Sequence, residues 1–494
     1  MAETPMSTAS PFSAPQRFIR VYEQPENPFA SKVSNQIIAI IPSFTLESGV
    51  TLYSVPLAYK TWGKLSSDGD NVIVVCHALT GSADIRDWWG PLIGGPGRIF
   101  DLTKFFVICM NSLGSPYGSA SPVTYKDGDS KKGIYGPEFP LTTIRDDVNF
   151  HKLLLDELGV KRVAAVIGGS MGGMLVLEWA YFGKDYIRCI APIATSGRHS
   201  AWGISWGEAQ RQCIYADPKY NDGYYSFEEP PSSGLGAARM SALLTYRSWD
   251  SFEARFSRKP SDVSKMTPAL DFDSSSPGDI HLAIHNDGHI SKQSLNNSTP
   301  SKTKTNKGER PVSCPLESKD QNANDSVPKL SPKIEHVKSP ALTHFSAQSY
   351  LRYKGTQFAK RFDANCYISI SRKLDTHDLS RSRSSSITEA LAMIEQPALV
   401  LGIESDGLFN FSQQEELASA IPNSRLDKID SIEGHDAFLL QCEQVNTLVL
   451  RFLHEVIPDK MQSKCDAQIG QISLETVVGE GLSLVEEMDN ITTW

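Results

Sequence analysis

The sequence places one serine among glycines, directly after an apolar run. Residues 163–167 are β-prone, Ser170 follows within Gly-Gly-Ser-Met-Gly, and a second apolar run with helical character comes next. Residues 168–172 fit Gly-x-Ser-x-Gly, the pattern of a strand, a sharp turn and a helix with a hydroxyl at its apex. A side chain at Gly168 or Gly172 would collide with the neighbouring strand and helix, and the serine backbone is strained. The pattern predicts that Ser170 is a nucleophile; the alternative is a strand–helix turn with a passive serine.

Two residues that a serine nucleophile needs follow later apolar runs. Asp406 comes after the strand-like run 397–403, and His435 comes after a strand expected near residues 426–429. Imidazole titrates near neutrality and can take the proton of a serine hydroxyl. A carboxylate beside it would hold one imidazole tautomer and stabilise the imidazolium. The alternatives are that Asp406 is a turn residue before Gly407, and that His435 only starts a helix.

Acyl transfer also needs N–H donors for the oxyanion. The Met171 N–H lies directly after Ser170, and the helix that starts there points its free N–H groups and positive dipole end at the site. A second donor is expected in residues 77–81, His-Ala-Leu-Thr-Gly, which follow the apolar run 71–76. We predict the Leu79 N–H as this donor, although the sequence constrains a backbone group only weakly.

Strand-like runs alternate with helical segments in the first two hundred residues and return near residue 397. This alternation predicts an α/β fold with a mostly parallel central sheet and helices on both faces. Functional sites in such sheets form outside the carboxyl ends of the strands. Ser170, Asp406 and His435 follow three such ends, in the chain order of the α/β-hydrolase fold. The predicted strands and helices in the first part are residues 37–62 (antiparallel strands), 71–76, 105–110, 143–158 (helix), 163–167, about 171–182 (helix) and 187–193.

Composition divides the chain into seven segments. Residues 201–258 and 344–388 have helical patterns that interrupt the sheet and predict a two-part lid over the site. Residues 259–343 are rich in Ser, Lys, Asn, Asp and Pro, and we expect a disordered surface insertion because they bury too little apolar surface. The other segments are a disordered N-terminus (1–26), the two parts of the α/β-hydrolase core (27–200 and 389–458) and a loose acidic tail (459–494).

Composition also excludes several classes of protein. The 494 residues are 40% hydrophobic and 21% charged, as in soluble globular proteins, and the net charge of −9 argues against nucleic-acid binding. No apolar run approaches the roughly 18 residues of a membrane span, and the N-terminus lacks the features of a secretory signal. The eight cysteines are scattered without a Cys-x-x-Cys pair, which predicts reduced thiols in the cytoplasm. We expect no metal site, including at His281, His285 and His289 in the insertion, and no permanently bound cofactor.

Seven segments, in order, resemble the homoserine O-acetyltransferase family, and its fungal members most of all. The likeness covers roughly residues 27–258 and 345–456, interrupted by an insertion longer than the bacterial enzymes carry. The segments are CHALTGSAD (76–84), WWGPLIGGPGRIFD (88–101), NSLGSPYGSASP (111–122), GGSMGGM (168–174), ARMSALLTYRS (238–248), SYLRYKGTQFAKRFDANCY (349–367) and EGHDAFLL (433–440).

This resemblance implies a ping-pong reaction in methionine biosynthesis. Ser170 would take the acetyl group from the co-substrate acetyl-CoA and pass it to the γ-hydroxyl of L-homoserine, with His435 as the base. The family's arginine for the substrate carboxylate matches Arg239, with Arg247 as the alternative, and its acidic partner for the substrate ammonium matches Asp436. A guanidinium binds a carboxylate through two parallel hydrogen bonds, and a zwitterion needs one charge of each sign. The resemblance also suggests a homodimer, with the lid helices as the interface.

Three other functions remain open at this point. A hydrolase would use the same three residues with water as the acceptor. A related acyltransferase would use another acceptor, L-serine or deacetylcephalosporin C, or another donor, succinyl-CoA. The residues that line the pocket decide between these substrates. A non-catalytic binding protein of the same fold would not require Ser170, Asp406 and His435 together.

Overall fold

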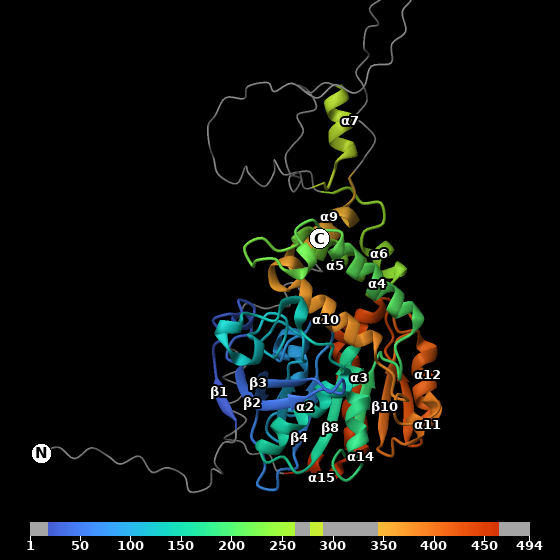
Figure 1. Cartoon of the computed structure of the whole chain (residues 1–494). Helices are drawn as coiled ribbons and strands as arrows, with labels where there is room; N and C mark the ends of the chain where they lie inside the picture. Colours follow the sequence, from blue (N-terminus) through green and yellow to red (C-terminus); the bar gives the residue numbers. More distant parts are fainter. Residues whose placement is uncertain (1–17, 262–276, 290–343, 464–494) are drawn as a thin grey trace, which may run out of the picture. The chain divides into compact units, whose positions relative to one another are not determined.

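The computed structural model describes residues 18–261, 277–289 and 344–463, which fall into two compact units. The first holds the described residues up to Ser257 and from Tyr350 onward, and the second is Arg258–Ser349. A nine-stranded sheet in the order β1-β2-β3-β7-β4-β8-β9-β10-β11 forms the centre of the first unit (Figure 1). Its strands are β1 Ile19–Val21, β2 Ile37–Thr45, β3 Thr51–Trp62, β4 Val72–Cys76, β7 Phe106–Met110, β8 Val163–Gly169, β9 Ile190–Ile193, β10 Ala398–Gly402 and β11 Ser424–Lys428.

The sheet is antiparallel at one edge and parallel in the rest. β1, β2, β3 and β7 pair antiparallel in turn, while β7, β4, β8, β9, β10 and β11 are parallel neighbours. Cys76 pairs with Gly168, and Gly169 pairs with Ile193, so β4, β8 and β9 end at the same level. The mostly parallel sheet predicted from the sequence is therefore confirmed, and its register brings the loops after these three strands together.

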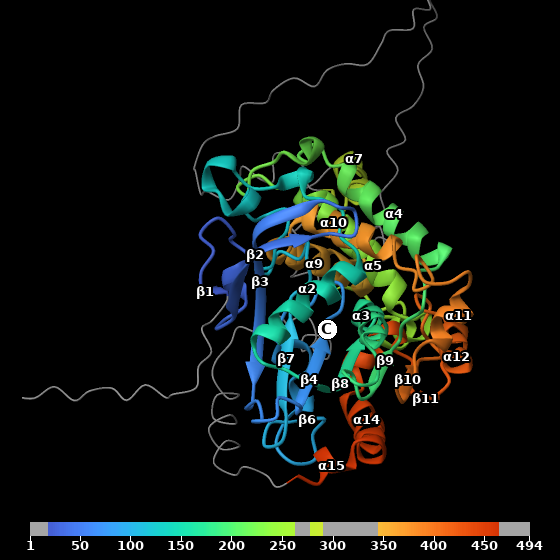
Figure 2. The same cartoon turned by 60° about the horizontal axis from the view of Figure 1, so that its bottom comes forward.

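Each central strand is buried on both faces because its side chains alternate between two cores. Val72 and Val74 of β4 belong to one apolar cluster, and Ile73 and Val75 belong to the other. The first cluster contains residues of α2, α3, α11 and α12, and Figure 2 shows α2 and α3 side by side on the sheet. The second contains residues of α1, α14 and α15. These helices are α1 Arg86–Trp89, α2 Ile144–Glu157, α3 Met171–Trp179, α11 Ile387–Ala392, α12 Phe411–Ala420, α14 Cys442–Val456 and α15 Pro458–Met461.

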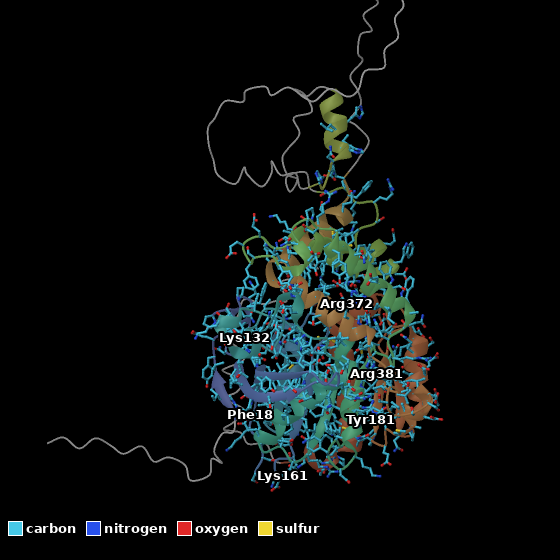
Figure 3. All side chains as sticks on the ribbon, in the orientation of Figure 1. Phe18, Lys132, Lys161, Tyr181, Arg372 and Arg381 are labelled. Atoms are coloured by element: carbon cyan, nitrogen blue, oxygen red, sulfur yellow. The ribbon has the colours of Figure 1, made fainter. Side chains whose placement is uncertain are left out.

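Helices of the first unit that are inserted between β9 and β10 are called the lid helices here, after the lid predicted for these residues, and Figure 1 shows α4, α5 and α10 together at one end of the sheet. At the crossing of α5 and α9, a Cβ on Gly355 would lie 2.8 Å from the Gly236 carbonyl oxygen, so glycine permits the close approach. In Figure 3, the labelled Arg372 shows where α10 lies among these helices. Arg381, a few residues later in the chain, lies closer to the helices that cover the sheet. The lid helices are α4 Ala201–Tyr215, α5 Ser232–Tyr246, α6 Trp249–Arg255, α9 Ser346–Arg361 and α10 Ala364–Asp375.

A buried ion pair attaches the lid to the core. The Lys373 ammonium on α10 lies 2.5 Å from an Asp147 carboxylate oxygen on α2, and both side chains are fully buried. Lys373 also donates to the Leu113 carbonyl, while Asp147 accepts from the Leu113 N–H. Loss of one partner of such a pair typically costs about 3–5 kcal/mol, so α10 is fixed to the strand end that precedes Leu113.

Most predicted elements are confirmed, but several helices were not predicted individually, among them α6, α10, α11 and α12. α10 buries Asn365, Ser371 and Lys373 together with its apolar residues, which obscures the expected apolar stripe. The N-terminal segment predicted as disordered contains β1, which pairs with β2, from residue 19. The rest of that prediction, residues 1–17, lies outside the described residues, as do residues 464–494 of the predicted tail.

The second unit contains one helix that composition did not predict, α7 Pro277–His285. The His344 imidazole lies 3.0 Å from the Asp287 carboxylate, and an isolated β-bridge joins Pro260 to Phe345. The rest of the predicted disordered insertion, residues 262–276 and 290–343, lies outside the described residues.

Candidate active site

Ser170 occupies a strained turn between β8 and α3. Its φ of 61° lies in the left-handed region that non-glycine residues rarely adopt. A Cβ on Gly172 would lie 2.1 Å from the Cys76 carbonyl oxygen, and one on Gly168 would lie 2.7 Å from it. The Ser170 N–H donates to the Ile193 carbonyl at 2.9 Å. The predicted need for glycine at both positions is thus explained by the end of β4, and the turn is tied to β9 on its other side.

Asp406 and His435 form a buried pair. The His435 Nδ1 lies 2.6 Å from one carboxylate oxygen of Asp406, and the other oxygen accepts from the Leu408 and Phe409 N–H groups at 2.8 and 2.9 Å. The Phe409 ring stacks on the imidazole at 5.1 Å between centroids. Burial lowers the pKa of His435, but the Asp406 carboxylate outweighs this and holds the pKa above its ordinary value. The pair can therefore orient a base and stabilise its protonated form.

Ser170 and His435 line the same cavity, of about 220 Å³. The His435 Nε2 is buried, and no hydrogen-bond partner is found for it in the part of the chain that the structure describes. Catalytic hydrogen bonds are often long before the substrate binds and shorten in the reacting complex. The free ring nitrogen and the serine hydroxyl therefore share a space in which a proton can pass between them.

His77 orients the peptide that carries the predicted Leu79 donor. Its Nε2 accepts from the Ser112 N–H at 3.0 Å, so its Nδ1 carries the proton and donates to the Ala78 carbonyl at 2.8 Å. Burial lowers the pKa of His77 to about 4, which keeps it in this neutral form. Because the peptide bond is planar and trans, a fixed Ala78 C=O fixes the Leu79 N–H in the opposite direction. Sequence reasoning missed this role of His77. The available signal was a histidine at the first position of the loop 77–81.

The other predicted donor, the Met171 N–H, lies at the start of α3. Met171 is the first residue of this helix, and the first N–H groups of a helix have no acceptor within it. Leu79 lines the cavity beside Ser170. The structure therefore brings the loop after β4 to the cavity that Ser170, directly before α3, also lines, and the oxyanion role of the two N–H groups stays a prediction.

Arg239 reaches the cavity from the lid helix α5. Its guanidinium lies between two aromatic rings, 5.0 Å from the centroid of Tyr246 and 4.8 Å from that of Phe358. Such rings attract a cation and restrict the plane of its donor groups. Arg239 thus presents a held positive charge to the cavity that Ser170 and His435 also line.

Asp436 also lines the cavity, where it forms an ion pair. Its Oδ2 lies 3.0 Å from the Nε of Arg247, and a second nitrogen of Arg247 contacts Glu433. Burial raises the pKa of Asp436, and the Arg247 charge opposes that shift. Arg247, which the sequence offered as the alternative to Arg239, is therefore already engaged by two carboxylates. Sequence reasoning missed Glu433, because nothing in a single sequence links it to Arg247.

Aromatic and cationic side chains also line the cavity, among small, polar and aliphatic residues. Trp88, Trp206, Tyr350, Tyr367, Lys354 and Arg361 line it. Among the described residues, no group of three or more His, Cys, Asp or Glu side chains is arranged to hold a metal ion. None of the helices in the described part of the chain has the length and apolar character of a membrane crossing.

Solved structures share this fold at low sequence identity. A homoserine O-acetyltransferase from Bacillus anthracis matches with a TM-score of 0.62 and 20% identity, over 85% of this chain and 96% of that one. An acetylester hydrolase from Corynebacterium glutamicum matches with a TM-score of 0.62 and 23% identity, over 88% of this chain and 99% of that one. A family model described as the alpha/beta hydrolase fold matches residues 71–273. The predicted α/β-hydrolase fold is thus confirmed.

Relatives at high identity cover nearly the whole chain. The homoserine O-acetyltransferase of Emericella nidulans is 58% identical over 99% of this chain and 100% of its own length. Those of Schizosaccharomyces pombe and Saccharomyces cerevisiae are 52% and 51% identical, each over 95% of this chain and 96% of their own. The resemblance that the seven sequence segments indicated is confirmed: the chain belongs to the homoserine O-acetyltransferase family.

Proposed function

We propose that this chain transfers an acetyl group from acetyl-CoA to the hydroxyl of L-homoserine, in methionine biosynthesis. The observation that carries the proposal is the arrangement of one cavity. The Asp406–His435 pair, with its 2.6 Å contact, meets Ser170 there, and the Arg239 and Asp436 charges line the same space. A nucleophile with a base permits acyl transfer, and one charge of each sign suits a zwitterionic acceptor.

In the first half-reaction, the Ser170 hydroxyl attacks the thioester carbon of acetyl-CoA while His435 takes its proton. Negative charge develops on the carbonyl oxygen, where the Leu79 and Met171 N–H groups stabilise it. The carbon–sulfur bond breaks, the CoA sulfur takes the proton from His435, and acetyl-Ser170 remains. Asp406 stabilises the imidazolium that forms between these two proton transfers.

In the second half-reaction, the homoserine hydroxyl attacks acetyl-Ser170, and His435 accepts the proton of that hydroxyl. The bond between the acetyl carbon and Ser170 breaks, and His435 returns the proton to the serine oxygen. Arg239 binds the carboxylate of the acceptor and Asp436 binds its ammonium, which places the hydroxyl at the acetyl carbon. No permanently bound cofactor takes part in this scheme.

The cellular compartment and the oligomeric state of the enzyme are also proposals. We place it in the cytoplasm because its cysteines are scattered and those that the structure describes are free thiols. We expect a homodimer formed through the lid, where Trp249 and Leu244 are 76% and 54% exposed. Sedimentation of the purified chain tests the dimer, and substitution of both residues by Ser should yield monomers.

The test of the function follows the release of free CoA with a thiol reagent. Purified protein receives acetyl-CoA together with L-homoserine, L-serine or water alone. Release should be fastest with homoserine, whereas equal rates with homoserine and water would establish a hydrolase, and a faster rate with serine would identify another acceptor. Ser170→Ala should abolish the acetyl adduct in mass spectrometry; an adduct that persists would mean another nucleophile.

A further inference from the structure

The catalytic histidine loop carries two carboxylates that share one buried guanidinium. Glu433 and Asp436 flank His435, and Arg247, at the end of lid helix α5, contacts both. The Arg247 side chain is only 3% exposed, and its Nε lies 3.0 Å from the Asp436 Oδ2. Two of its nitrogens are engaged, so Arg247 is poorly placed to bind the carboxylate of a substrate. Its position instead determines where the Asp436 carboxylate lies.

Further contacts fix this part of the lid to the histidine loop. The Ser248 hydroxyl donates to the Ile432 carbonyl, and the Ser251 hydroxyl donates to Glu433 at 2.6 Å. A Cβ on Gly434 would lie 2.7 Å from the Ser248 nitrogen, so the two backbones are in direct contact. Arg247 is therefore held at both ends, by its own backbone and by Glu433.

Charged groups surround the Asp436 carboxylate on several sides. Glu433 lies on the same loop, the guanidinium groups of Arg247 and Arg239 oppose the rise in the pKa of Asp436, and Arg255 interacts with Glu433. Arg239, on the same cavity wall, supplies a positive charge. A buried carboxylate without a cationic partner tends to take up a proton, whereas a fixed guanidinium favours its ionised form. Arg247 contacts the Oδ2 of Asp436, and the Asp436 side chain, which is 20% exposed, lines the cavity that the cation of a ligand would enter.

We propose that Arg247, held by Glu433, is a positioning residue that fixes the Asp436 carboxylate for the ammonium of the acyl acceptor. The second half-reaction thereby selects an amino alcohol over the same alcohol without its amine. This inference rests on the proposed function, because it concerns the acceptor that the acetyl-enzyme receives. It assigns Arg239 and Arg247 different tasks, one on each end of the acceptor.

The test compares two acceptors that differ only in the ammonium group, L-homoserine and γ-hydroxybutyrate. In Arg247→Met, kcat/KM for homoserine should fall by about 30-fold or more, as when a partner of a buried charge pair is removed. The value for γ-hydroxybutyrate should fall much less, so the preference for homoserine shrinks. Arg247→Lys, which keeps the charge, should restore part of the preference. Acetyl-Ser170 formation in each variant, measured by mass spectrometry, reports whether the fold and the first half-reaction persist.

Two further variants keep the test decisive. Ser248→Ala removes a contact between the same two segments without touching Asp436, and it should keep the preference for homoserine. Glu433→Gln, which retains a hydrogen-bond acceptor, should reduce the preference without removing the guanidinium, and it serves if Arg247→Met does not fold. Equal losses for both acceptors, or an unchanged preference in Arg247→Met and Glu433→Gln, would overturn the inference. Failure of the proposed function is distinct, since the wild-type chain itself would then not favour homoserine over water.

Discussion

The nucleophile turn and the acceptor site are built in different ways. Ser170 is positioned by backbone: its strained φ is held by glycines packed against the end of β4 and by a hydrogen bond to β9. Asp436 is positioned by side chains, through a guanidinium on a lid helix. Arg247 and Glu433 are 186 residues apart in the chain. In the proposed reaction, the first region would serve both half-reactions, while the second would serve only the acceptor.

This difference gives the two regions different sensitivities. Damage to the Ser170, Asp406 and His435 group should slow both the loading of acetyl-Ser170 and its transfer. Damage to the acceptor site should leave loading largely intact and slow the transfer, because acetyl-CoA meets the enzyme before the acceptor does. Substitutions in each region test whether loading and transfer of the acetyl group respond differently.

The largest expected effect is that of Asp406→Asn. An asparagine leaves the imidazole without its charged partner, and kcat should fall by about 10⁴-fold in both half-reactions. His435 acts as a base only when neutral, so the wild-type rate falls as the pH drops through its pKa, which Asp406 raises. Without that charge, burial lowers the pKa, and the acidic limb of the residual activity should move to lower pH. Stopped-flow acetylation across pH measures both effects.

Asp427→Asn is the matched control. Asp427 lies on β11 and pairs with Arg425 and Arg451 outside the cavity wall. Exposed pairs of this kind contribute about 0–1 kcal/mol, so its pH profile should match the wild type. An unshifted acidic limb in Asp406→Asn would remove Asp406 from the assigned role.

The next largest effect is expected on the stability of the turn that holds Ser170. In Gly172→Ala, the new Cβ would lie 2.1 Å from the Cys76 carbonyl oxygen, which is backbone and cannot rotate away. The free energy of unfolding should fall by about 3 kcal/mol, at the upper end of overpacking effects. Gly90→Ala is the control, since a Cβ there meets nothing within 4 Å and its φ is −45°. Denaturant titration should show the loss in the first variant and little change or a slight gain in the second; equal midpoints would refute the packing argument.

His77 offers two substitutions that separate its two hydrogen bonds. His77→Asn keeps a donor near the Nδ1 position that contacts the Ala78 carbonyl, and His77→Gln keeps an acceptor near the Nε2 position that contacts the Ser112 N–H. Because the Ala78 carbonyl sets the direction of the Leu79 N–H, the glutamine variant should lose more kcat, by about 10–100-fold. Single-turnover acetylation measures this difference. A slower asparagine variant would show that the Ser112 contact, not the Ala78 peptide, is what matters.

The smallest effect is expected from deletion of residues 265–338. All the candidate site residues belong to the first compact unit, and the deletion falls within the second. We therefore expect kcat/KM for both substrates to stay within about twofold, as loops of very different length are tolerated. Activity assays and folded yield measure this, and a large loss of either would give the insertion a role in the site.

The contrast between the regions also explains what the sequence could predict. The turn at Ser170 is encoded locally, by glycines at fixed spacing after an apolar run, so its geometry was predictable. Asp406 and His435 were predictable because each lies in the loop after a strand of the parallel sheet, β10 or β11. The Leu79 donor was predicted, but its support by His77 depends on Ser112, which follows another strand.

Long-range polar contacts were not predictable. Lys373 and Asp147 form a fully buried pair across 226 residues, and neither position carries a local signal. The sequence offered Arg247 as the alternative to Arg239 for the substrate carboxylate, whereas in the structure Arg247 contacts Glu433 and Asp436. Such pairings follow from the packing of the lid, which one sequence does not specify.

The most direct test of the account separates the two half-reactions in two variants. Asp406→Asn and Arg239→Lys are each mixed rapidly with acetyl-CoA, and intact-protein mass spectrometry follows acetyl-Ser170 as it forms and then as homoserine consumes it. The account predicts that Asp406→Asn slows formation severely, while Arg239→Lys forms acetyl-Ser170 at close to the wild-type rate and transfers it slowly. Slow formation to the same degree in both variants would contradict the division between a catalytic centre that serves both half-reactions and an acceptor site that serves only the second.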